Sequence, residues 1–177
     1  MLGFIETIDQ NITSFIISIF PRSPLFDMTF SFLSVQGLTV VIWLFILFLY
    51  ISWEEYHHHE FILYFLLSFG VSTFLVNVVF KNIIQRLRPW VVWHFAQGGC
   101  PADFSFPSGH AAGAFSGAVI FAHFDPKRRF VYYTLAVLIA FSRVYLYCHF
   151  TFDVIVGGLI GYGVGKILLL ALKKRTR

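Results

Sequence analysis

Three ionisable side chains, Arg143, His149 and Asp153, interrupt an apolar and aromatic stretch. An ionisable group in such surroundings costs several kcal/mol unless it is paired or hydrated, so these residues are candidates for chemistry. His149 and Asp153 are four residues apart, so on a helix they share one face and the carboxylate can accept the Nδ1 proton. The other nitrogen then presents a lone pair, and Arg143 suits a phosphate held in front of it. A histidine satisfied at the membrane interface and an arginine extended towards water are the alternative.

Two cations stand at the end of an earlier apolar run. Lys81 and Arg88 are seven residues apart, which is two helical turns, so the sequence predicts both on one face of a helix. Pro89 predicts the end of that helix, and Trp90 and Trp93 place the stretch at the level of the lipid headgroups. The cations can bind an anion there, although cations at a helix end also serve as partners of the helix dipole.

A proline, a serine and a glycine open the next apolar run, at Pro107, Ser108 and Gly109, and His110 follows them. Backbone N–H groups at the start of a helix bind anions, and a glycine there lets the anion approach closely. His110 would lie beside such an anion. Pro-Ser-Gly is also a common helix start in the absence of any ligand.

The composition excludes an ordinary soluble domain, because 58% of the 177 residues are hydrophobic, 12% are charged and the mean hydropathy is +0.75. A bilayer core requires about 20 apolar residues per helix, and the predicted fold is a single all-α domain of transmembrane helices, residues 1–177. The apolar runs predict spans at residues 38–53, 61–80, 111–124, 130–142 with a continuation, and 154–171. Residues 25–33 form either a further crossing or a surface helix, so the bundle has five or six spans. Nucleic acid is not implied as a partner.

The first 20 residues carry Glu6 and Asp9 among apolar positions, and the run 12–20 is too short to cross a bilayer by itself. They predict an N-terminal helix in the membrane interface. The start lacks a basic segment and a small-residue cleavage site, so a cleaved signal peptide is not expected.

The alternating direction of successive spans assigns a side to each polar element. The cations near Arg88, the turn before His110 and the stretch from Arg143 to Asp153 all fall on the same face of the membrane. The opposite face carries basic residues at 127–129 and among 173–177, and basic loops tend to stay on the cytoplasmic side. The candidate site is therefore expected to face the periplasm or the exterior.

Glycines recur every four residues in the two helices next to the histidines. Such spacing lets membrane helices approach closely, and both helices begin at the outer face, so a shared seam would bring His110 and His149 towards one another. The residues are Gly109, Gly113 and Gly117 in one helix and Gly157, Gly161 and Gly165 in the other.

Two further patterns carry less weight. Three adjacent histidines lie in the polar segment 54–60, but neighbouring side chains point in different directions and no ligand spacing accompanies them, so no metal site is predicted. Cys100 and Cys148 both fall on the outward face, where a disulfide would persist. The sequence does not contain their distance, and two free thiols are favoured over a bridge.

Together, the three polar elements resemble the signature motifs of the type 2 phosphatidic acid phosphatase family. The motifs are Lys81-x6-Arg88-Pro89, Pro107-Ser108-Gly109-His110 and Ser142-Arg143-x5-His149-x3-Asp153, which match without a departure. The resemblance implies that His149 is the nucleophile and forms a phosphohistidine, that Asp153 orients it, and that His110 protonates the leaving oxygen. It also implies that no metal or other cofactor is required, and that the phosphate is held by Lys81, Arg88, Ser108, Gly109 and Arg143.

The resemblance, the length and the hydropathy predict a multi-pass enzyme of the inner (cytoplasmic) membrane that hydrolyses a lipid phosphate or diphosphate at the outer face. The candidate substrates are undecaprenyl diphosphate, phosphatidylglycerol phosphate, phosphatidate and the 1-phosphate of lipid A, and no motif chooses among them. The expected partners are this substrate and the membrane lipids, and the oligomeric state is open. The alternative is a non-enzymatic binder or transporter of lipid phosphates, which would need the cations but not an oriented pair of His149 and Asp153.

Overall fold

The computed structural model describes residues 2–20, 22–34, 59–95 and 99–173, and every regular element among them is helical. The longer helices are α1 (Leu2–Ile19), α2 (Pro24–Ser34), α4 (His59–Phe74), α7 (Gly109–Phe124), α8 (Arg129–Tyr145) and α9 (Thr151–Lys173). The shorter elements are a π-helix, η1 (Leu75–Phe80), α5 (Lys81–Ile84), α6 (Pro89–Val92) and a 3-10 turn, η2 (Pro126–Arg128). The all-α class is confirmed for these residues, and the predicted span 38–53 lies outside them.

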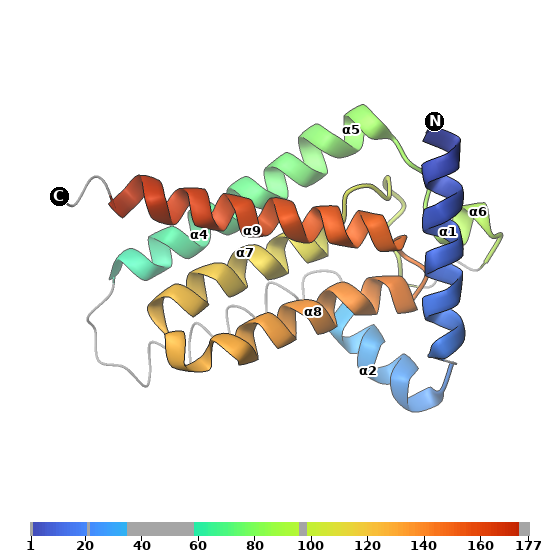
Figure 1. Ribbon diagram of the computed structural model, residues 1–177, viewed down its shortest axis with the longest axis horizontal. Helices are drawn as coiled ribbons and strands as arrows, with labels where there is room; N and C mark the ends of the chain where they lie inside the picture. The colour runs from blue at the N-terminus through green and yellow to red at the C-terminus, as the bar shows by residue number, and fades with distance from the viewer. Residues whose placement is uncertain (1, 21, 35–58, 96–98, 174–177) are drawn as a thin grey trace.

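The helices α4, α7, α8 and α9 form a bundle, in which α7 packs against the other three (Figure 1). This central position explains the small residues of α7, because Ala111, Ala114 and Ala118 are completely buried between its neighbours. Among the residues that the structure describes, two stretches are long and apolar enough to cross a membrane, Glu60–Val92 and Thr151–Ala171. Both stretches run along the bundle (Figure 1), so we expect its long axis to lie across the bilayer.

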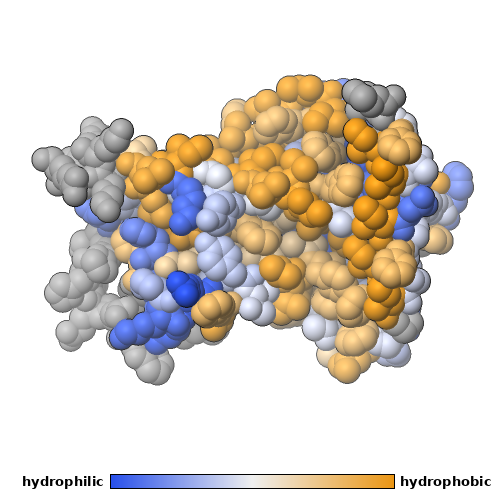
Figure 2. All heavy atoms as spheres, in the orientation of Figure 1, coloured by the Kyte–Doolittle hydropathy of each residue, from blue (hydrophilic) through white to orange (hydrophobic). Residues whose placement is uncertain are grey.

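The N-terminal helix α1 lies across one end of this bundle (Figure 1). One side of α1 is apolar and well exposed at Phe4, Phe15 and Ile19, and a stripe of hydrophobic residues follows the helix in Figure 2. The other side buries Asp9 and Thr13 completely. A helix that presents an apolar side at the end of a membrane bundle fits the predicted interfacial position.

The predicted helix at 25–33 is present as α2, which packs against α8. The ring of Phe30 lies 5.4 Å from that of Phe141 and 4.7 Å from that of Tyr145, measured between centroids. The hydroxyl of Tyr145 also donates to Oδ1 of Asp27 at 2.8 Å. These contacts hold the end of α8 that carries Arg143.

The glycines of α9 face α7, as the predicted seam requires. A Cβ atom on Gly157 would overlap the carbonyl oxygen of Ser108, and one on Gly161 would overlap that of Ala112. Only glycine permits this approach, because the obstacle is backbone that cannot move aside. The start of α9 is thereby fixed against the start of α7.

The glycines at the start of α7 serve a different contact, so this half of the predicted seam is wrong. A Cβ atom on Gly109 would meet the side chain of Asn77, and one on Gly113 would meet the ring of Phe69. These partners belong to η1 and α4. Glycine periodicity predicted close packing correctly but not which neighbour each glycine faces, because α7 has neighbours on several sides.

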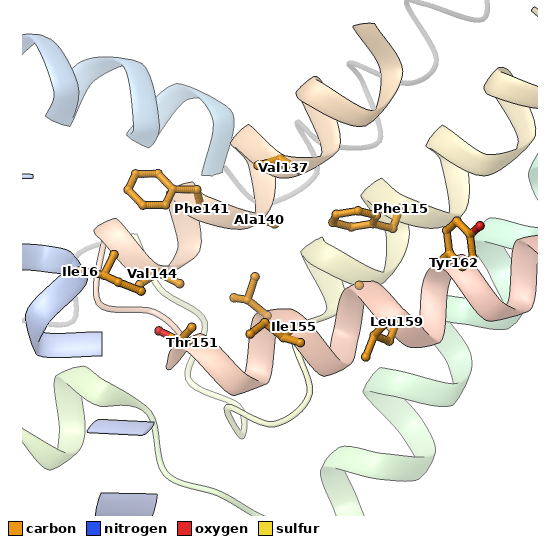
Figure 3. A pocket seen from close by; sticks show the side chains of 12 residues that line it. Ile16, Phe115, Val137, Ala140, Phe141, Val144, Thr151, Ile155, Leu159 and Tyr162 are labelled. Atoms are coloured by element: carbon orange, nitrogen blue, oxygen red, sulfur yellow. The ribbon is translucent and has the colours of Figure 1, made fainter. Parts of the chain in front are cut away.

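Another side of α9 borders an apolar groove of about 500 Å³ between α1, α8 and α9 (Figure 3). Its walls include Ile16, Val144, Leu159 and Tyr162. Leu159 is 64% exposed, so this surface of α9 is suited to hydrocarbon, whereas the surface towards α7 is closed by backbone contacts.

Candidate active site

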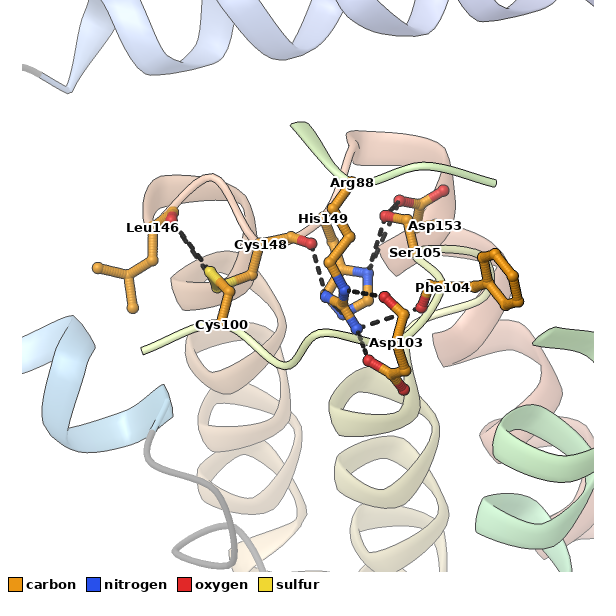
Figure 4. Close-up of a disulfide and its surroundings, with 9 residues drawn as sticks. All are labelled: Arg88, Cys100, Asp103, Phe104, Ser105, Leu146, Cys148, His149 and Asp153. Atoms are coloured by element: carbon orange, nitrogen blue, oxygen red, sulfur yellow. Dashed lines mark hydrogen bonds and ion pairs between the residues drawn. A yellow bond between two sulfur atoms is a disulfide. The ribbon is translucent and has the colours of Figure 1, made fainter. Parts of the chain in front are cut away.

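Three connecting segments meet at the end of the bundle that α1 covers. They are residues 85–88 after α5, residues 99–108 before α7, and residues 146–150 between α8 and α9. Nη1 of Arg88 donates to the carbonyl oxygen of Cys148 at 2.7 Å and lies 3.1 Å from Nε2 of His149 (Figure 4). The element that contains Lys81 and Arg88 is therefore in direct contact with the element that contains His149.

Arg88 also determines which nitrogen of His149 carries the proton. A guanidinium can only donate, so Nε2 accepts from Nη1 and the imidazole proton lies on Nδ1. Nδ1 lies 3.4 Å from Oγ of Ser105, and that hydroxyl donates to Oδ2 of Asp153 at 2.5 Å. The lone pair of Nε2 therefore points towards the cationic side of the site.

His149 and Asp153 do not share a helix face, so that prediction is wrong. His149 precedes α9, which begins at Thr151, and its Nδ1 is 3.7 Å from Oδ2 of Asp153. Asp153 lies in the first turn of α9, where Oδ2 accepts from the backbone N–H of Phe150 at 2.9 Å. The carboxylate thus fastens the start of the helix and reaches the imidazole partly through Ser105, a geometry that residue spacing does not reveal.

Burial and charge keep the imidazole of His149 neutral. The residue is 1% exposed, and burial lowers its pKa well below the usual value. The positive charges of Arg88, Arg143 and Lys81 act in the same direction. A neutral imidazole retains the lone pair that a nucleophile needs.

Lys81 and Arg88 do not lie along one helix, contrary to the prediction. The helix ends at Ile84, Gln85 adopts a left-handed conformation with a φ of 51°, and Pro89 begins α6. The helix therefore ends at a left-handed residue rather than at the proline. Both cations are nonetheless buried, with exposed fractions of 5% and 1%.

A carboxylate without a recognisable sequence signal joins these two cations. Oδ2 of Asp103 pairs with Nζ of Lys81, and Oδ1 pairs with Nη2 of Arg88, each at 2.5 Å. Burial opposes the charge of Asp103, but pairing with Lys81 and Arg88 holds the pKa of its carboxyl below the usual value. An anionic group therefore lies between two of the cations expected to bind phosphate.

The Pro-Ser-Gly-His element forms the start of α7. Ser108 is the N-cap, and its Oγ accepts from the N–H of Ala111 at 3.4 Å. The N–H of Ser108 donates to the carbonyl oxygen of Asp153 at 2.9 Å, which joins the starts of α7 and α9. Gly109 and His110 are the first two residues of α7. The Pro-Ser-Gly-His element therefore lies beside the element that ends at Asp153.

Arg143 is completely buried in the last turn of α8. Its carbonyl oxygen accepts from the N–H groups of Cys148 and His149 at 3.0 and 3.1 Å, which closes a tight turn between α8 and α9. His110 is within electrostatic reach of Arg143 and of His149. The two predicted catalytic histidines are therefore in one site.

Cys100 and Cys148 form a disulfide, so the prediction of two free thiols is wrong (Figure 4). Their Cα atoms are 5.3 Å apart, although 48 residues separate them in the sequence. The bridge joins the segment before α7 to the residue next to His149. The path of that segment decides the distance between the thiols, and sequence spacing does not report that path.

Ser105, Arg86 and Asp9 also belong to the site and were not selected from the sequence. Arg86 pairs with Asp153 at 2.6 Å and with Asp9 at 2.7 Å. The one available signal was the presence of Asp9 among apolar residues in the first helix. Nothing in the spacing of Arg86 or Ser105 distinguishes them from ordinary loop residues.

The residues described by the structure contain no group of three His, Cys, Asp or Glu side chains arranged for a metal ion. Most of the histidine-rich segment, residues 54–58, lies outside them. The positive charge around His149 comes from Arg88, Arg143 and Lys81.

The PAP2 superfamily model matches residues 61–177. Phosphatidylglycerophosphatase B of Bacillus subtilis is 37% identical over 119 residues, which are 61% of this chain and 54% of that protein. An undecaprenyl-diphosphatase of Sulfolobus acidocaldarius is 36% identical over 94 residues, which are 51% of this chain and 46% of that protein. The chain thus spans about half the length of the curated relatives it matches.

Two crystal structures have a similar fold over most of their length. Aquifex aeolicus LpxE gives a TM-score of 0.73 at 28% identity, over 90% of this chain and 93% of that one. A transmembrane PAP2-type phosphatidylglycerolphosphate phosphatase from Bacillus subtilis gives 0.71 at 27% identity, over 96% of this chain and 87% of that one. Because the family match covers most of the chain and contains all three polar elements, the chain belongs to the PAP2 superfamily.

Proposed function

We propose that this protein is an integral-membrane phosphatase that removes phosphate from a lipid phosphate or diphosphate through a phosphohistidine on His149. The hydrogen bond from Nη1 of Arg88 to Nε2 of His149 carries the proposal, because it leaves a neutral imidazole with its lone pair turned towards cations. Family membership supports the reaction class, as do relatives named for phosphatidylglycerophosphate and undecaprenyl diphosphate.

In the first step, Nε2 of His149 attacks phosphorus while the bond between phosphorus and the lipid oxygen breaks. Lys81, Arg88 and Arg143 stabilise the charge on the phosphate oxygens. His110 gives its proton to the leaving oxygen, so the lipid departs as a neutral alcohol, or as a monophosphate when the substrate is a diphosphate. The negative charge of the bound phosphate favours the protonated form of His110 among these cations.

In the second step, water attacks the phosphorus of the phosphohistidine and the P–N bond breaks. The neutral His110 accepts the proton of the water, and inorganic phosphate leaves. Asp153 and Ser105 keep the Nδ1 proton in place and stabilise the positive charge of the modified imidazole. His149 then regains its lone pair.

The site is proposed to face the outer side of the inner membrane. Basic residues 127–129 lie at the opposite end of α7 and α8 from His149, and basic ends remain on the cytoplasmic side. The Cys100–Cys148 disulfide favours the same orientation, because such bonds persist in oxidising compartments.

The proposed substrate class includes phosphatidylglycerol phosphate and undecaprenyl diphosphate, which correspond to the named relatives. Phosphatidate and the 1-phosphate of lipid A remain in the class, because the proposed roles of the site residues concern the phosphate and none of them selects the rest of the lipid. The apolar residues on the face of the bundle shown in Figure 2 suit a substrate that is held in the bilayer.

The test is release of inorganic phosphate from each of these four lipids by purified protein in detergent micelles. We expect release from at least one lipid, resistance to chelators because three cations supply the positive charge, and no release by His149→Ala. A protein that binds the lipids but releases no phosphate would be a binder or transporter. Complete loss of turnover after chelation, restored by one added metal, would overturn the metal-independent mechanism.

A further inference from the structure

One arginine holds two buried carboxylates at the edge of the site. Nη1 of Arg86 donates to Oδ2 of Asp9 at 2.7 Å and to Oδ1 of Asp153 at 2.6 Å. These three side chains are 11%, 1% and 0% exposed, so water and salt screen the ion pairs poorly. The guanidinium carbon also lies 4.3 Å from the ring centroid of Phe150, which restricts its position further.

We propose that Arg86 and Asp9 are positioning residues, which hold the Asp153 carboxylate in the orientation that serves His149 and make the N-terminal helix α1 a functional part of the active site. This inference rests on the proposed roles of His149 and Asp153.

The two oxygens of Asp153 have separate tasks. Oδ1 pairs with Arg86, while Oδ2 accepts from Ser105 and from the N–H of Phe150 and lies 3.7 Å from Nδ1 of His149. Rotation of the carboxylate away from the imidazole would break a buried ion pair, so Arg86 restricts that rotation. Without Arg86, the carboxylate would lose both this restraint and its nearest cation.

The same side of α1 caps the start of α9. Oδ1 of Asp9 accepts from the N–H of Phe152 at 2.9 Å, and Oγ1 of Thr13 accepts from the N–H of Thr151 at 2.9 Å. N–H groups in the first turn have no acceptor within their own helix, so α1 supplies the missing partners. Asp9 is therefore shared between the cap of α9 and the ion pair with Arg86.

Asp9 and Thr13 form a matched pair for an experiment. They are one turn apart on α1, both are completely buried, and both accept from the first turn of α9. Asp9 pairs with Arg86, whereas the hydrogen bonds of Thr13 are made with Thr151. Asp9→Asn keeps an acceptor for α9 but removes the charge, whereas Thr13→Val removes a cap contact and leaves the ion pairs in place.

The measurement is steady-state kinetics of purified variants on p-nitrophenyl phosphate and on the preferred lipid. Arg86→Met should lower kcat roughly 10- to 100-fold, as loss of a residue that orients a catalytic group does, with KM nearly unchanged because Lys81, Arg88 and Arg143 remain. Arg86→Lys should recover part of the loss, because it restores a cation between the carboxylates.

Asp9→Asn should lower kcat by roughly three- to tenfold, and Thr13→Val should keep kcat within about twofold of the original. The double variant Asp9→Asn/Arg86→Met should lose no more than Arg86→Met alone, because both residues act through one ion pair.

Three results would overturn the inference. They are equal loss of kcat in Thr13→Val and Asp9→Asn, an effect of Arg86→Met on KM alone, and unchanged kinetics in both the Arg86 and the Asp9 variants. His149→Ala and Asp153→Asn in the same series distinguish failure of the proposed function from failure of the positioning role. Activity in both of these variants would contradict the proposed function itself. Inactive His149 and Asp153 variants beside fully active Arg86 and Asp9 variants would reject the positioning role alone.

Discussion

The two ends of α7 lie in opposite chemical environments. At its start, Arg88 and His149 are each 1% exposed and in contact. At its other end, the ring of Phe121 lies 4.9 Å from that of Phe61 and 5.2 Å from that of Tyr132. One helix thus joins a cluster of buried charges to a cluster of buried aromatic rings.

A carboxylate at each end shows what this difference means. Asp125, after α7, accepts from Nη1 of Arg128 at 2.9 Å and from the hydroxyl of Tyr132 at 2.7 Å, and thereby closes the turn into α8. Asp153 also accepts a backbone N–H at a helix start, that of Phe150 before α9, but its proposed second role is to orient the imidazole of His149. Buried charge must be paired to be tolerated, whereas aromatic packing stabilises without that cost. We therefore expect substitutions at the start of α7 to change activity and those at its end to change stability.

The largest expected effect separates the two histidines of the polar end by leaving group. His149→Ala should be inactive on every substrate, because the nucleophile is needed whichever group leaves. His110→Ala should lose roughly 100- to 10,000-fold on a lipid monoester but much less on p-nitrophenyl phosphate, whose leaving group needs no proton. A diphosphate lipid should lie between. Equal losses for both variants on all substrates, measured as kcat/KM, would contradict this division of roles.

At the aromatic end, Phe121→Ala should lower the free energy of unfolding by about 3–5 kcal/mol, because a fully buried ring is removed. Activity per folded molecule should remain unchanged. Phe74→Ala is the control, since Phe74 is 57% exposed and should have little effect on stability. Thermal unfolding in detergent, with kcat measured below the transition, makes the comparison. A loss of kcat without loss of stability would break the proposed separation of the two ends.

The disulfide at the polar end is expected to contribute about 2–5 kcal/mol, as bridges closing loops of this length commonly do. Replacement of both Cys100 and Cys148 by serine should lower the unfolding temperature, and a reductant should lower that of the original protein alone. Mass spectrometry after alkylation without reductant provides the direct check. Full labelling of both thiols would show that the bridge does not form.

The smallest expected effect concerns Asp103, whose carboxylate lies between Lys81 and Arg88. Asp103→Asn should strengthen inhibition by inorganic phosphate by less than about fivefold, because the side chain of Asp103 is 47% exposed and such pairs contribute less than about 1 kcal/mol. Ion pairing keeps the pKa of Asp103 low, so Asp103 stays ionised between about pH 6 and 8 and its own titration should not change this gain. Weaker inhibition by phosphate would show that Asp103 positions the cations instead of competing with the substrate.

Spacing along the chain was sufficient for features that depend on nearby residues. The apolar runs at 61–80, 111–124, 130–142 and 154–171 are helical, because hydrophobicity and the absence of breakers act within a few turns. Ser108 caps α7, as the Pro-Ser-Gly pattern indicated. The three signature motifs likewise identified the family, because their residue types and order are properties of the sequence itself.

The tertiary structure alone decided the contacts that join distant segments. Arg86 reaches Asp9 and Asp153 across 77 and 67 residues, and the disulfide closes a separation of 48. Asp103 meets the two cations only because the segment before α7 folds over them. His149 and Asp153 do lie close together, but not on one helix face as their spacing predicted, because α9 begins between them. These distances depend on how connecting segments cross at the end of the bundle, and residue spacing carries no information about that crossing.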